Sequence, residues 1–152
     1  MATTTATITL SSADLLSDNL SLSATTTLNK HNTTATGLDE MRMERLEIPI
    51  DDYGGGTATQ YDLIANSAAL LRKPSWVYIA NKNTDATHYV TISIKDDIIG
   101  KLYAGDWMFI PWSCDINAGN GSAVEIQAYV ATAKIEYALF HDGDTLTTAA
   151  DS

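Results

Sequence analysis

The feature that most constrains this chain is a series of short segments in which apolar and polar residues alternate. Side chains on a β-strand point alternately to its two faces, so Val90, Ile92 and Ile94 share one face of a predicted strand. Residues of the kind that favour turns, chiefly Asn, Asp and Gly, lie between the segments. Strands at this spacing predict an all-β fold, and we expect a single β-sandwich that is jelly-roll-like. The predicted strands are residues 57–64, 76–81, 88–94, 98–103, 107–111, 123–130 and 134–140.

The N-terminal third differs from the rest because residues 1–36 are rich in Thr, Ser, Ala and Leu and contain no aromatic residue. Apolar residues alternate with hydroxyl residues around Ile8 and Leu10 and again from Leu20 and Leu22, which predicts two strands. An isolated hairpin is marginal in water, so its apolar face needs a cover. Two interpretations stay open: a hairpin packed on its own body, or an extended N-terminal arm that completes its burial on a neighbouring subunit.

These differences predict three parts of the chain. Residues 1–36 form the arm or hairpin, residues 37–56 a charged linker with a Gly-rich turn, and residues 57–152 the sandwich body. Within the linker, Glu40 and Glu44 lie four residues apart, as do Met41 and Arg45, which predicts a brief helix. Ile48-Pro49-Ile50 predicts an edge strand, because proline cannot donate to a sheet ladder.

The charge balance limits the partners of the chain. Nine Lys and Arg stand against nineteen Asp and Glu, which gives a formal charge of −10. Nucleic-acid binding depends on neutralising phosphates with clustered cations, so we expect no nucleic-acid partner. Anionic membranes repel such a chain, and no segment approaches the roughly twenty apolar residues of a membrane span. We expect a protein made and folded in a cytoplasm.

The reactive residue types do not form a recognisable catalytic or metal-binding pattern. His31, His88 and His141 lie in separate segments, without the spacing of a zinc hydrolase, and are expected on the surface or in loops. Cys114 is the only cysteine, so we expect no intrachain disulfide and a small buried side chain. Asp142-Gly143-Asp144 lacks the remaining ligands of a calcium loop. We therefore expect a non-enzyme with no catalytic residue, metal ligand or cofactor.

The segment from Trp107 to Trp112 is apolar at consecutive positions rather than alternate ones, which predicts that both of its faces are covered. One face would pack in the core, and the other would meet the arm or another subunit. A central strand buried within its own sandwich is the alternative. Large aromatics together with Met and Pro are typical of interfaces. The predicted interface residues are Ile8, Leu10, Leu20, Leu22, Trp107, Phe109, Pro111 and Trp112.

The body also carries a family resemblance. A strand that ends in Asn81 is followed by the Thr-containing strand 89–92 and by an L-x-x-G-[DE] turn, Leu102 to Asp106, that leads into the aromatic-Pro strand. In this order, residues 76–140 resemble structural proteins of tailed-phage virions, and the chain is most similar to capsid decoration (cement) proteins. The resemblance implies a non-enzymatic protein on the capsid exterior that stabilises the major capsid protein shell, and it implies a homotrimer.

A receptor- or glycan-binding module of a phage tail or fibre is the alternative. In that role Trp76, Trp107 and Trp112 would stack on sugars.

Overall fold

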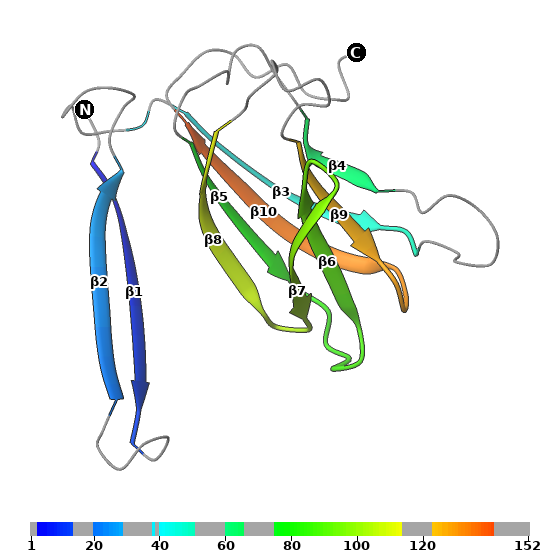
Figure 1. Cartoon of the computed structure of the whole chain (residues 1–152), viewed down its shortest axis with the longest axis horizontal. Coiled ribbons are helices and arrows are strands. Elements are labelled where there is room, and N and C mark those ends of the chain that lie inside the picture. The colour runs from blue at the N-terminus through cyan, green and yellow to red at the C-terminus, as the bar shows by residue number, and fades with distance from the viewer. Residues whose placement is uncertain are drawn as a thin grey trace. The chain divides into compact units, whose positions relative to one another are not determined.

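The structure, a computed structural model, describes residues 3–13, 20–28, 38, 40–50, 60–65, 75–113 and 123–141. Within these residues it is all-β, with antiparallel sheets and no helix. The chain divides into two compact units, Met1–Asp39 and Glu40–Ser152 (Figure 1).

The first unit is a two-stranded antiparallel hairpin formed by β1 (Thr4–Ser12) and β2 (Leu20–Leu28). Leu10 lies opposite Leu22, and Ile8 lies opposite Ala24. The register therefore gathers the apolar residues of both strands on one face, where the pairs at its two ends are mixed: Thr4 with Leu28, Ala6 with Thr26 and Ser12 with Leu20. This is the pairing that the period-two pattern of both strands favours.

The second unit contains eight strands in its described part, in two antiparallel four-stranded sheets with the orders β3-β10-β5-β8 and β4-β9-β6-β7 (Figure 1). The predicted strands are confirmed from residue 76 onward, with ends shifted by two residues or fewer. Of the strand predicted at 57–64, the structure has β4 from Tyr61 to Ile64, Gln60 lies outside the strand, and residues 57–59 lie outside the described residues. The bounds are β3 (Glu40–Ile48), β4 (Tyr61–Ile64), β5 (Ser75–Asn81), β6 (Tyr89–Ile94), β7 (Asp97–Tyr103), β8 (Trp107–Trp112), β9 (Val124–Ala128) and β10 (Ala133–His141).

The two four-stranded sheets share one hydrophobic core. Alternate residues of the central strands point into it, among them Val77 and Ile79 of β5, Ile92 of β6, Ile126 of β9 and Ile135 of β10. The exposed fraction of each of these five side chains is 1% or less. Burying a side chain of this kind contributes about 1.5–3 kcal/mol. The alternation predicted for these strands therefore reflects a core that both sheets build.

The helix predicted within residues 37–47 is wrong, because Glu40–Ile48 is the strand β3. β3 pairs along its whole length with β10, and this pairing with a long apolar strand outweighs the weak helical spacing. The residues do alternate: Leu46 and Ile48 pack on the core, whereas Met41 and Met43 are exposed. The edge strand predicted over Ile48-Pro49-Ile50 is wrong in its bounds, because β3 ends at Ile48 and Pro49 lies outside it. Ile50 forms an isolated bridge with Ala128, and β3 itself is an edge strand among the described strands of its sheet.

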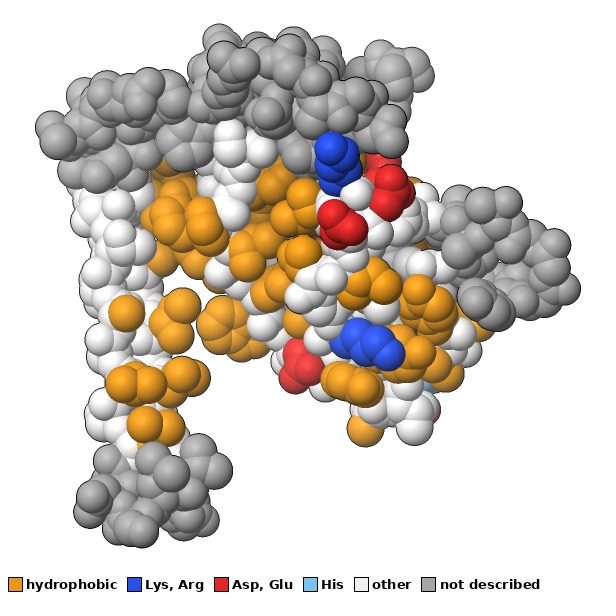
Figure 2. Space-filling view, in the orientation of Figure 1, with side chains coloured by type: hydrophobic (Ala, Val, Ile, Leu, Met, Phe, Trp, Pro, Cys, Tyr) orange, Lys and Arg blue, Asp and Glu red, His pale blue; other side chains and the backbone are white. Residues whose placement is uncertain are grey.

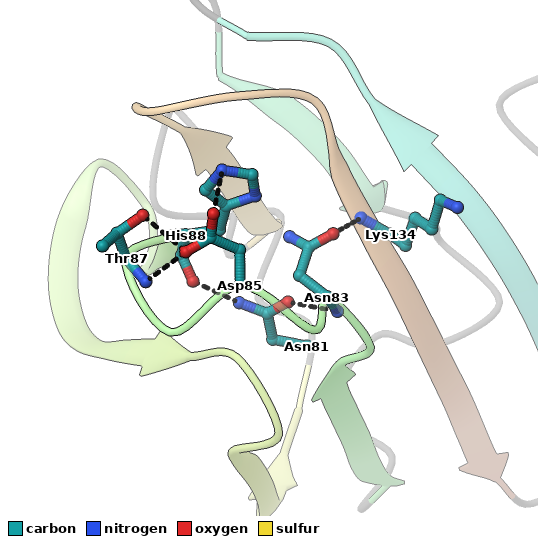
Figure 3. Close-up of polar contacts among 6 residues, drawn as sticks. All are labelled: Asn81, Asn83, Asp85, Thr87, His88 and Lys134. Atoms are coloured by element: carbon teal, nitrogen blue, oxygen red, sulfur yellow. Dashed lines mark hydrogen bonds and ion pairs between the residues drawn. The ribbon is translucent and has the colours of Figure 1, made fainter.

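The end of β5 is held by a buried asparagine (Figure 3). Asn81 is fully buried, and its Nδ2 donates to the backbone oxygens of His88, at 3.2 Å, and Leu102, at 3.0 Å. Its Oδ1 accepts from the backbone N–H of Asn83 at 3.0 Å. One side chain thus joins the end of β5 to the start of β6 and to β7, which belong to the other sheet.

The L-x-x-G-D turn completes this junction. The N–H of Gly105 donates to the backbone oxygen of Asn81 at 2.9 Å, and Gly105 has φ +87°, a conformation that favours glycine. The carboxylate of Asp106 accepts from the N–H of Tyr103 at 2.9 Å. The motif behind the family resemblance therefore has a structural role, since it ties β7 and β8 to the end of β5.

The histidines do not all lie where the sequence suggested. His141 is fully buried on β10, so the expectation of a surface or loop residue is wrong there. His88 is half-buried in the loop before β6, with its Nε2 at 3.6 Å from a carboxylate oxygen of Asp85 (Figure 3). The predictions for His31 and Cys114, and for Asp142-Gly143-Asp144, lie outside the described residues.

Candidate interaction surfaces

The hairpin carries an apolar face whose large side chains are exposed along most of its length. Ile8, Leu10 and Leu22 are 40%, 54% and 55% exposed, respectively, although all three are large hydrophobic residues. Figure 2 shows hydrophobic side chains along one side of the hairpin. We call this surface the hairpin apolar face, and it consists of Ala6, Ile8, Leu10, Leu20, Leu22 and Ala24.

The opposite face of the hairpin consists entirely of hydroxyl side chains in its paired region. Thr7 and Thr25 face one another with their Oγ1 atoms 3.0 Å apart, and Thr9 faces Ser23. Neither β1 nor β2 contains a charged residue. The hairpin therefore has one apolar and one polar surface, both uncharged.

A second apolar surface covers the outer side of the β3-β10-β5-β8 sheet. The strand registers place its side chains in rows that run across all four strands. We call this surface the aromatic face. One row is Met41, Phe140, Trp76 and Pro111; the next is Met43, Ala138, Tyr78 and Phe109; and Trp107 lies beside Ala80 in the third.

The rings of the aromatic face contact one another. Trp76 and Phe109 stack with centroids 5.3 Å apart, Phe109 meets Phe140 edge-on at 6.2 Å, and Tyr78 and Trp107 lie 6.4 Å apart. Pairs of this kind contribute about 0.5–1.5 kcal/mol each beyond their buried area, so the rings form an ordered surface. Trp107 is 53% exposed. Figure 2 shows hydrophobic side chains gathered where β8 lies in Figure 1.

Charges lie at one end of the aromatic face. Arg45 donates to the carboxylate of Glu136 at 2.7 Å, in the row that contains Ala80 and Trp107. The guanidinium side is open to solvent, whereas the Glu136 side chain is nearly buried. Such a pair contributes little energy at an exposed site, but it marks the polar boundary of an apolar surface.

A second ionic group lies on the inner side of the same sheet. Glu44 pairs with Arg42 and accepts a hydrogen bond from the hydroxyl of Tyr137 at 2.8 Å. Burial acts to raise the pKa of Glu44, but the hydrogen bonds from Arg42 and Tyr137 outweigh it and lower that pKa. Burial and the same hydrogen bond raise the pKa of Tyr137. These contacts link β3 to β10, with the carboxyl of Glu44 in its charged form and the hydroxyl of Tyr137 in its neutral form.

The predicted interface residues of β8 separate onto two sides of the sheet. Trp107, Phe109 and Pro111 belong to the aromatic face, whereas Trp112 points into the core and is buried. Trp112 therefore offers no contact surface. β8 is also at the edge of its sheet, so the alternative of a central strand is wrong.

Sequence reasoning missed most of the aromatic face, because it predicted only Trp107, Phe109 and Pro111. Met41, Met43, Tyr78 and Phe140 were not predicted as interface residues, and Trp76 was considered only for sugar binding. The alternation of Trp76 and Tyr78 with buried Val77 and Ile79 was the available signal. It indicates a strand with apolar residues on both sides.

Two open cavities lie near the polar end of this sheet. One, of about 200 Å³, is lined by the rings of Tyr78 and Trp107 and by Lys82 and Asn83. The other, of about 460 Å³, is lined by Arg45, Lys82 and Lys134 together with Glu47 and two apolar residues.

Two further searches cover only the residues that the structure describes. There, no three His, Cys, Asp or Glu side chains come together as a metal site would require. Nor does that part of the chain hold a helix that is long and apolar enough to cross a membrane.

A scan of the sequence against protein-family models found no match, and no curated protein matched it either.

Proposed function

We propose that this chain is a non-enzymatic structural protein of a tailed-phage virion that decorates and stabilises the capsid through subunit contacts. The observation that carries the proposal is the presence of two exposed, uncharged apolar surfaces, the hairpin apolar face and the aromatic face. Soluble monomers rarely expose large contiguous apolar patches, and such patches mark surfaces that bind other proteins. The half-exposed side chains Leu10, Met43 and Trp107 exemplify them.

The strand order supports a jelly-roll body. If the eight strands from β3 to β10 are counted one to eight, the two sheets follow the orders 1-8-3-6 and 2-7-4-5. A jelly roll has eight strands in two sheets built from two Greek keys, and it is common in viral capsid and lectin domains. The body is preceded by the hairpin, which on this proposal is an N-terminal arm.

The mode of action follows from the surfaces. A decorating subunit adds no reaction; it stabilises the shell by removing apolar area from water at boundaries between shell proteins. The acidic character of the chain keeps many copies soluble before they attach. On this proposal the major capsid protein is the partner, and the protein acts on the capsid exterior.

Immunogold electron microscopy of purified virions that contain the chain tests this function. Gold-labelled antibody against the body should decorate the capsid shell at many positions. Particles from which the protein has been stripped should release their DNA at a lower temperature than intact particles, and adding the purified protein back should restore the difference. Virions that carry no label on the shell would contradict the proposal.

Glycan or receptor binding by a tail or fibre is the second candidate, and the cavity beside Trp107 favours it. An exposed indole next to Tyr78, with the Asn83 amide in the same lining, presents the aromatic and polar groups that a sugar ring contacts. Label confined to the tail, together with glycan-array binding that Trp107→Ala abolishes, would favour this function over decoration.

A further inference from the structure

We propose that the hairpin apolar face of one copy of the chain packs on the aromatic face of a second copy. This deepens the proposed function, because it names the contact by which copies associate. The inference rests on the proposed function in one respect, the premise that copies of the chain associate.

The first argument is that the described residues of neither unit cover that unit's own apolar surface. On the hairpin, Leu10 and Leu22 form a cross-strand pair of which more than half is exposed. On the body, Met41 and Met43 are 58% and 50% exposed. Every copy thus carries one surface of each kind, so copies can cover these surfaces for one another in equal numbers.

The second argument is the match in chemistry. The hairpin strands contain no charged residue, and the two rows that begin with Met41 and Met43 contain none either. No buried charge would therefore be left unpaired when the two faces meet, and unpaired charges are the main cost of burying a surface. The hydroxyl face of the hairpin, with Thr7 and Thr25, would remain toward water.

The third argument is the match in dimensions. Side chains on one face of a strand repeat about every 6.8 Å, both along β1 and along β5, and packed sheets lie about 10 Å apart. The nine-residue strands β1 and β2 extend about 30 Å, as do β3 and β10. The ridges formed by Ile8 and Leu10 are therefore spaced to fit between the rows of the aromatic face.

The fourth argument concerns symmetry. A contact between two different patches is heterologous, and it generates a closed ring when the rotation between copies closes. The eleven residues from 29 to 39 span at most about 40 Å, which is enough to carry a hairpin from one body to the next. Hairpin exchange around a closed ring of three copies would give the trimer that the family resemblance implies.

Charge substitutions on the two faces of the hairpin test this contact. We expect Leu10→Asp/Leu22→Asp to convert the oligomer to a species of about 16.4 kDa in light scattering coupled to size exclusion. The matched control is Thr9→Asp/Ser23→Asp, which adds the same charge to the neighbouring cross-strand pair on the opposite face. The control should keep the native mass. Far-ultraviolet circular dichroism, which reports on the β-sheets of the body, should be unchanged in both variants.

Cross-linking identifies the acceptor surface. In a Cys114→Ser background, Leu10→Cys mixed with Met43→Cys should form a disulfide-linked dimer, whereas Thr9→Cys mixed with Met43→Cys should not. Met43 is exposed, so its replacement should preserve the fold.

Three results would overturn the inference. They are a native chain that is monomeric at high micromolar concentration, an unchanged oligomer in the Leu10→Asp/Leu22→Asp variant, and a Leu10→Cys/Met43→Cys double variant that cross-links only within one chain. These measurements use the purified protein without particles. A failure here therefore leaves the capsid test unaffected, and a failure to label the capsid leaves these results unaffected.

Discussion

Replacing Asn81 should destabilise the body far more than replacing any neighbouring loop residue. Its fully buried side chain makes hydrogen bonds at 3.2, 3.0 and 3.0 Å to three backbone groups. A net contribution of about 1 kcal/mol for each bond gives a loss of about 3 kcal/mol for Asn81→Ala. For a unit of this size, 1 kcal/mol corresponds to roughly 4 °C, so the melting temperature should fall by about 12 °C.

A graded control is available in the same loop. Asn83 is half-buried, and its Oδ1 accepts one hydrogen bond, from the N–H of Lys134 at 3.2 Å. Asn83→Ala should therefore cost only about 1 kcal/mol. Thr84→Ala, at an exposed position, should be close to neutral. The order of the three melting temperatures tests whether hydrogen-bond number determines the loss.

Asn81→Asp separates hydrogen bonding from side-chain size. The substitution keeps the acceptor for Asn83 but turns a carboxylate oxygen toward the carbonyl oxygens of His88 and Leu102. Burial and these oxygens raise the pKa of the new carboxyl, so the variant should be less stable than Asn81→Ala at pH 7 and should recover as the pH falls. The reasoning is refuted if Asn81→Ala melts within 3 °C of the native chain, or if Asn81→Asp is the more stable of the two at pH 7.

Two further substitutions test local electrostatics. Asp96, at φ +65° in the turn between β6 and β7, should gain about 1 kcal/mol of stability on replacement by glycine. Burial raises the pKa of Glu125 and the charge of Asp96 adds to the rise, against a hydrogen bond from the backbone N–H of Asp96 that lowers it. Because glycine keeps that N–H and removes the charge, Asp96→Gly should also lower the pKa of Glu125 in an NMR titration; an unchanged value would contradict this. Glu44→Gln should destabilise the chain at pH 7. Burial raises the pKa of Glu44, but Arg42 and Tyr137 lower it by more, so this pKa is lower in the folded chain than in the unfolded chain. The carboxylate therefore stabilises the fold at a pH above the unfolded pKa of Glu44, and this stabilisation is lost as the pH falls through the folded pKa. Urea unfolding should therefore show a difference that shrinks between about pH 5 and pH 3, and a difference that grows would refute the assignment.

The sequence predicted the strands well where their signal is local. Val90 and Ile92, or Ile135 and Leu139, alternate with polar or less apolar neighbours, and each pair lies in the core. Such alternation depends only on the strand and the face that it buries. The hairpin was predictable for the same reason, since Leu10 and Leu22 repeat with the period of a strand.

The sequence did not predict which side of β8 would be buried. Because all its residues from Trp107 to Trp112 are apolar, alternation carries no information there. The pairing of Pro111 with Trp76 decides the outcome by placing Trp112 in the core and Phe109 outside. That register is a contact between distant segments, and so is the pairing with β10 that makes a strand of Glu40–Ile48.

The aromatic face could not be predicted as a surface for a related reason. One of its rows combines Met41, Trp76, Pro111 and Phe140, which come from four strands separated by up to a hundred residues. Only the sheet order brings them together. Each residue taken alone fits an ordinary core position.

The edge strand β8 bears on how the chain associates. Pro111 lies within β8 and has no N–H, so a strand added along the outer edge of β8 would lack a hydrogen-bond donor at that position. Edge strands that carry proline are protected against strand addition. The outer face of the same strand, with Trp107 and Phe109, has no such protection. Association at β8 is therefore favoured through the faces of the sheets rather than through their edges, as the packing of the hairpin apolar face on the aromatic face requires.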